Sequence, residues 1–192
     1  MKGIAVLCTA LAVAAPIVLA QGDVPRKSIE ESRRIADQVS VALRDQLIRE
    51  MQISGPVRSL IACKFSCPEI LSTPSRRTGW RIAAVSLKPR NPALGAADAW
   101  EQRVLLDMGR RVAAGEKAEG LEAWEVVAEP QGRFFRYAVA MPVEPMCLAC
   151  HGKADSISAP VKAQLAVDYP FDRAIGFGQG DIYGIVSIKQ PL

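Results

Sequence analysis

The sequence predicts an α+β domain with a small antiparallel sheet, a long N-terminal helix and flanking helices. Apolar residues at helical spacing run through residues 28–54. Two β-rich runs, over 121–129 and 133–143, are joined by a short turn, which is typical of an antiparallel hairpin. The order along the chain is long helix, short helix, strand, helix, hairpin, loop and strand, and this order describes an α+β domain.

The first twenty residues have the pattern of a secretory signal peptide. Lys2 precedes a small and apolar run that ends at Ala20, with small side chains at the −3 and −1 positions of the expected cut. The alternative is an uncleaved N-terminal anchor, for which the apolar run is barely long enough. Cleavage would leave residues 21–192 as a single domain in the periplasm, without stable insertion into the membrane.

The composition argues against one class of partner. The formal net charge of the 192 residues is only +4, and the basic residues form no long run or stripe interleaved with aromatic side chains. Nucleic acid is therefore not an expected partner.

The long helix begins at a Ser-x-x-Glu capping box that starts at Ser28. Its opposite side is heavily charged, so one face remains to be buried. Gly55 ends this helix, and Pro56 suits the first turn of a second, shorter helix. Pro68 is expected to close the second helix, because proline removes a backbone donor from a helix interior. The apolar positions of the long helix include Ile29, Ala36, Val39, Leu43, Leu47 and Met51.

Turn signals separate the remaining elements. Residues 72–79 and 88–96 read as loops, and "EPQG" at 129–132 suits a type I turn. Asp98 and Glu101 repeat the capping-box pattern. The expected elements are a strand over 80–87, a helix from Asp98 to about Ala114, strands over 121–129 and 133–143, and a last strand over 181–189. Phe135, Tyr137, Val139, Met141 and Val143 alternate onto one face of their strand, a wall for a core or a flat apolar ligand.

The motif "CLACH" carries the main chemical prediction. Cys-x-x-Cys-His is the attachment signature of c-type haem. Two thiols at this spacing reach the two vinyl groups on one edge of the porphyrin, and the following imidazole lies under the iron. We therefore expect one covalently attached haem c, bound by Cys147, Cys150 and His151, with His151 as a ligand of the iron.

Three other interpretations of the motif compete with haem. A thioredoxin-type dithiol follows an early strand and opens a long helix, whereas this motif lies late in the chain. A zinc site would need Cys63 and Cys67 as further ligands, and a disulfide would leave the histidine without a role.

The glycine-rich stretch 176–180 leads into a β-rich run, so we expect a hairpin turn there and not a nucleotide-binding loop.

The second iron ligand is left open by the residues themselves. His151 is the only histidine, so ligation by two histidines within one chain is impossible. Met146 is tethered on the same side of the iron as His151. A disulfide between Cys63 and Cys67 within one helix would be strained. The remaining candidates are Cys63, Cys67, Met51, Met108 and Met141, although Met108 and Met141 also fit core positions.

Five segments occur together in the order of a known family: "LIACKFSCPEI", "TGWRIAAVSLKPRNP", "DAWEQRVL", "CLACHG" and "YPFDRAIGFGQGDIYGIVS". The chain resembles the periplasmic c-type haem, PAS-like domain family, the Tll-like haem domain, which is also found in front of sensor kinases. The resemblance covers most of residues 28–189. It implies a PAS-like sheet around the haem, with Cys63 as the ligand opposite His151.

Two positions depart from the family pattern. Cys67 stands where the family more often has a small non-thiol residue, which leaves open an oxidised pair with Cys63 that would release the iron. Ala84 stands where the family often has an arginine that might have faced a haem propionate. Lys88 and Arg90 are candidates for that role, with a solvated loop as the alternative.

The expected function is that of an exported mono-haem c-type cytochrome. Thiolate ligation lowers the reduction potential, so we expect a non-enzymatic electron carrier or redox sensor of low potential. Its partner would be a redox protein or a separate signalling protein. The alternative is a haem module that responds to nitric oxide or carbon monoxide, and a third interpretation is an exported thiol-disulfide oxidoreductase.

Overall fold

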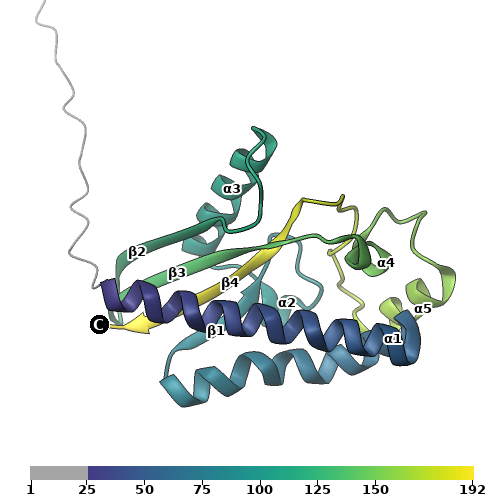
Figure 1. Ribbon diagram of the computed structural model, residues 1–192, viewed down its shortest axis with the longest axis horizontal. Coiled ribbons are helices and arrows are strands. Elements are labelled where there is room, and N and C mark those ends of the chain that lie inside the picture. Colours follow the sequence, from purple (N-terminus) through teal and green to yellow (C-terminus); the bar gives the residue numbers. More distant parts are fainter. Residues whose placement is uncertain (1–25) are drawn as a thin grey trace, which may run out of the picture.

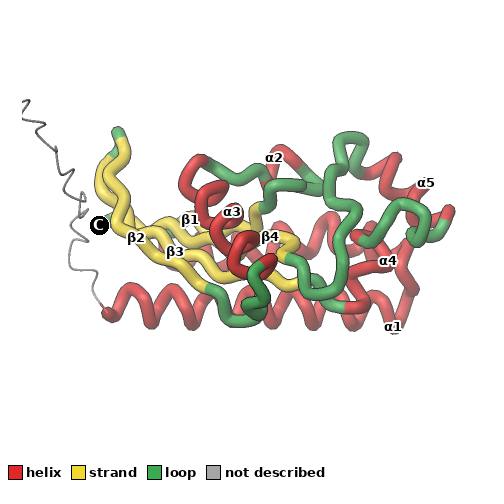
Figure 2. The backbone as a smooth tube through the Cα atoms, turned by 90° about the horizontal axis from the view of Figure 1, so that it is seen from above, coloured by secondary structure: helices red, strands yellow, loops and turns green. Residues whose placement is uncertain are grey.

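The computed structural model describes residues 26–192, which form a four-stranded antiparallel sheet covered by helices on both faces (Figures 1 and 2). The strand order is β1-β4-β3-β2. The predicted α+β class is therefore confirmed, whereas the predicted signal peptide lies outside the described residues. The strands are β1 (Arg81–Val85), β2 (Glu122–Glu129), β3 (Gly132–Pro142) and β4 (Ile182–Pro191).

The long helix α1 (Arg26–Thr78) is a pair of helical arms joined at Gly55. Gly55 has φ 71° and ψ 177°, a backbone conformation that glycine adopts at little cost. The second arm folds back beside the first (Figure 1). The predicted break at Gly55 and Pro56 is thus confirmed.

The predicted end of the second arm at Pro68 is wrong, because the helix continues through Pro68 and Pro74 to Thr78. A proline inside a helix costs about 3 kcal/mol, so tertiary contacts must offset that cost. Leu71 packs against the core, and the Ser75 hydroxyl accepts a hydrogen bond from the backbone N–H of Ile82 at 3.1 Å. The stretch 72–79, expected to be a loop, therefore ends the helix and fixes it to β1.

The core has one half on each face of the sheet. On the first face, Ile35 and Val39 of α1 pack against Phe135 and Tyr137 of β3. On the second face, Trp100 and other residues of α3 (Ala99–Ala113) pack against Ala138 and Ala140. The predicted alternation along β3 is confirmed, and so are its hairpin with β2 and the capping box of α3.

Four short helices were not predicted. They lie in segments that the sequence predicts to be loops, because too few apolar residues recur there to give a helical period. Even the longest of the four helices buries only Val161 and Leu165. The glycine stretch 176–180, expected to be a hairpin turn, instead lies in the connection from the last helix to β4. The four helices are α2 (Pro92–Gly95), η1 (Pro145–Cys147), α4 (Leu148–His151) and α5 (Ala159–Asp168).

Within residues 26–192, no helix is both long and apolar enough to cross a membrane.

A buried ionic network joins α3 to the sheet. Glu101 is 0% exposed, accepts from Arg81 at 2.7 Å and lies 3.4 Å from Arg136, which is itself 2% exposed. Arg136 also pairs with Asp98 at 2.7 Å and Glu129 at 3.0 Å, so loss of the Glu101 charge would leave Arg136 with two of its three carboxylates.

Glu101→Gln weakens the charge-assisted hydrogen bonds that Glu101 accepts, and it should therefore lower the free energy of unfolding by about 2 kcal/mol, measured by urea denaturation. Asp107→Asn is the matched control on the same helix. Asp107 forms an exposed pair with Arg110, so its loss should cost less than about 1 kcal/mol. Equal effects of the two substitutions would contradict the network's role.

Candidate functional site

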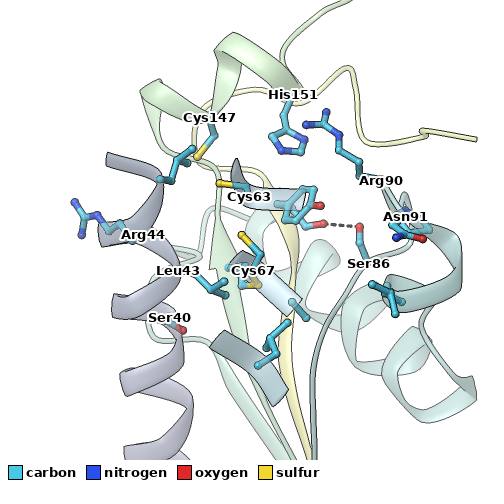
Figure 3. A pocket seen from close by; sticks show the side chains of 18 of the residues that line it. Ser40, Leu43, Arg44, Cys63, Cys67, Ser86, Arg90, Asn91, Cys147 and His151 are labelled. Carbon is cyan, nitrogen blue, oxygen red and sulfur yellow. Dashed lines mark hydrogen bonds between the residues drawn. The ribbon is translucent and has the colours of Figure 1, made fainter. Parts of the chain in front are cut away.

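A cavity of about 690 Å³ lies between α1, the β1 side of the sheet and the cysteine motif. This volume is within the range of about 300–1,000 Å³ that small-molecule and cofactor sites have. Both arms of α1 contribute apolar side chains, and the motif closes one side (Figure 3). Its apolar lining includes Leu43, Leu47, Leu60, Val85, Met141 and Val143.

The two motif thiols are anchored in different apolar clusters. Cys147, the last residue of η1, packs beside Val143 and Phe177. Cys150, in α4, packs in the cluster that contains Leu60 and Val161. Burial raises the pKa of both thiols, so each is neutral at pH 7. Both thiols line the cavity.

The His151 ring points into the cavity (Figure 3) and is held from behind. Its Nδ1 lies 2.8 Å from the backbone oxygen of Ala174, and a carbonyl only accepts, so Nδ1 carries the proton. The ring also packs edge-on against Tyr183, with centroids 4.6 Å apart. Burial, and then the charge of Arg90, lowers the pKa of His151 to about 3. A neutral imidazole results, and the lone pair of Nε2 is its metal-binding electron pair.

Cys63 lines the same cavity from the second arm of α1, between the motif and Cys67 in the view of Figure 3. Cys67 lies one helical turn further along. Interaction with the Cys67 thiol lowers the pKa of Cys63, whereas interaction with Cys63, together with burial, raises the pKa of Cys67. Cys63 is therefore the more acidic thiol of the two. In the described chain, all four cysteines are free.

Comparison with known proteins identifies the family of the chain. A family model described as Tll0287-like matches residues 20–191. The chain belongs to the Tll0287-like family.

A solved structure shares the fold, and a search of curated proteins finds no match. The crystal structure of the cyanobacterial heme-protein Tll0287 superposes with a TM-score of 0.67 at 22% sequence identity. The match covers 88% of this chain and 97% of that chain. At 22% identity, the structural similarity between the two proteins establishes a shared fold alone.

The structure brings most of the predicted site residues of this Tll0287-like chain together. Cys63, Cys67, Cys147, Cys150 and His151 line one cavity, and so do Met51, Met141 and Met146. Met108 does not line the cavity, because it is a residue of α3 that is 1% exposed in the core between α3 and the sheet. Across residues 26–192, no three His, Cys, Asp or Glu side chains form a cluster that could hold a metal ion.

The two departures from the family pattern lie at the cavity. Cys67 and Ala84 both line it. Lys88, a candidate for the missing arginine's role, instead lies over the Phe177 ring, 4.9 Å from the centroid.

Arg90, the other candidate, is not in a solvated loop. Its side chain is 11% exposed and forms an ion pair with Asp172. Sequence reasoning missed the roles of Asp172, Ala174 and Tyr183. They lie in the segment 169–187 that carries the family resemblance, but each is more than twenty residues from His151 and nothing in the local pattern shows that they contact it.

Proposed function

We propose that this chain is an exported c-type cytochrome with one covalently bound haem, acting as a low-potential electron carrier or redox sensor. One observation supports this most strongly. A neutral imidazole, His151, points into an apolar cavity that the Cys147, Cys150 and Cys63 thiols also line, and the pKa of Cys63 is lowered. The related heme-protein Tll0287 has the same fold.

The residues present fit a haem. Cys147 and Cys150 would form the two thioether links, for which free thiols are required. His151 would supply Nε2 to the iron, with its ring orientation fixed by the Ala174 carbonyl. The apolar lining would exclude water from the porphyrin faces.

The chain's own residues account for a low potential. Bound haem would supply a one-electron ferric/ferrous couple. The negative sulfur of Cys63 would favour the ferric charge and lower the reduction potential. Binding of the iron by both His151 and Cys63 would disfavour oxygen chemistry, which agrees with a carrier or sensor and not an oxygen-activating enzyme. The partner would be a separate redox or signalling protein.

The position of Cys67 favours a second candidate, a module that responds to nitric oxide or carbon monoxide. The pKa of Cys67 is raised, so this thiol would stay protonated one helical turn from Cys63, where it could donate to an iron-bound Cys63 sulfur and withdraw electron density from it. A ligand weakened in this way is more easily displaced by a gas. A thiol-disulfide oxidoreductase is supported less, because its nucleophile needs a lowered thiol pKa, whereas burial raises the pKa of Cys147 and Cys150.

Carbon monoxide binding distinguishes the first two functions. For a carrier, carbon monoxide added to the dithionite-reduced protein should leave the visible spectrum unchanged over minutes, because Cys63 keeps its position. Cys63→Ala is the positive control and should bind carbon monoxide at once. Rapid binding to the wild-type protein would favour the gas-responsive module instead.

A further inference from the structure

We propose that Arg90 and Asp172 form an ion pair that positions His151 and sets the reduction potential of the iron it would hold. Arg90 raises the potential and Asp172 lowers it. This proposal rests on the proposed haem function and adds to it two residues that are neither iron ligands nor haem attachment points.

The pair is connected to His151 by a short chain of hydrogen bonds. Arg90 Nε donates to Asp172 Oδ2 at 3.0 Å, and Asp172 Oδ1 accepts from the backbone N–H of Ala174 at 2.7 Å. The Ala174 carbonyl accepts from His151 Nδ1 at 2.8 Å. Asp172 therefore fixes the peptide segment that orients the imidazole.

Arg90 contacts the motif from the other side. Its Nη2 donates to the Cys150 carbonyl at 2.5 Å and to the Ala174 carbonyl at 3.3 Å. The Ala174 oxygen is thus shared between the guanidinium and the imidazole. A carbonyl that also faces a cation accepts less strongly from His151, which makes the imidazole a weaker electron donor to a metal.

Burial makes these charges effective. The side chains of Arg90 and Asp172 are each 11% exposed, so water screens them less than surface groups. A positive charge near the iron disfavours the ferric state, and a negative charge favours it. The charge effect and the hydrogen-bond effect of Arg90 therefore have the same sign. Loss of Asp172 would leave the Arg90 charge unbalanced and give the opposite sign.

The opposite signs separate this role from a structural one. If the pair only held the loop in place, both substitutions would loosen the same contacts and shift the potential in the same direction. Arg90→Met removes the cation. Asp172→Asn keeps an oxygen that can accept from Ala174 while removing the charge. Arg90→Lys keeps a positive charge but loses the planar fork that reaches two carbonyls.

The test uses haem-loaded protein and measures the midpoint potential after covalent haem is verified by the pyridine haemochrome spectrum. Arg90→Met should shift the ferric/ferrous equilibrium about tenfold towards ferric, a fall of about 59 mV for one electron. Asp172→Asn should shift it severalfold towards ferrous, and Arg90→Lys should restore most of the Arg90→Met change. Lys88→Met, the control at a second cation near the site, should change it less than about twofold, because Lys88 is exposed.

Two results would overturn the inference. If the midpoint potential shifts in the same direction in Arg90→Met and Asp172→Asn, the pair has a structural role only. If the midpoint potential changes in neither variant, the pair does not set it. If Arg90→Met does not fold, the sign measured for Asp172→Asn decides alone. Wild-type protein without covalent haem would overturn the proposed function itself, a failure that the haemochrome spectrum identifies before any potential is measured.

Discussion

Cys63→Ser should abolish the low-spin thiolate-type signals of the ferric protein in electron paramagnetic resonance, while the haem stays bound. The thiolate is the donor that favours the ferric charge, so its loss should also raise the midpoint potential, by on the order of 100 mV or more. The structural basis is the position of Cys63 in the cavity that His151 also lines, with its pKa lowered by the Cys67 thiol (Figure 3).

Three matched variants test the assignment of Cys63. Cys67→Ser, Met141→Ala and Met108→Ala should each retain the thiolate-type signals. Cys67 and Met141 line the same cavity, and Met108 lies in the core on the other face of the sheet. If one of these three abolishes the signals and Cys63→Ser does not, that residue is the ligand and Cys63 is not.

Replacing both motif thiols should have the second large effect. In the double variant Cys147→Ala and Cys150→Ala, acidified acetone should extract all of the haem, because no thioether link remains. Each single variant should keep one link and retain the haem during extraction. Cys67→Ala is the control: this thiol also lines the cavity, yet its loss should leave covalent haem unchanged. Complete extraction from the wild-type protein would contradict covalent attachment.

The sequence predicted the features that depend on local patterns. Gly55 breaks α1 because the required backbone conformation favours glycine, and the alternation along β3 follows from the two-residue period of a strand. The motif residues were found because Cys-x-x-Cys-His is a compact chemical pattern. These features need no knowledge of which segments meet in space.

The features that were missed depend on tertiary contacts. Pro68 stays inside α1 because packing and the bond between Ser75 and β1 offset the local cost of proline. The ion pair of Arg90 was missed for the same reason. Its partner Asp172 is 82 residues away in the sequence, and only the folded chain places both beside the Ala174 carbonyl.

The mass of the intact exported protein tests the central claim most directly. The protein should be made in a host that matures c-type cytochromes and analysed under denaturing conditions, which remove any haem that is not covalently bound. We predict the mass of the polypeptide plus one haem, together with the pyridine haemochrome spectrum of a c-type haem. A colourless protein with the mass of the bare polypeptide would contradict the account.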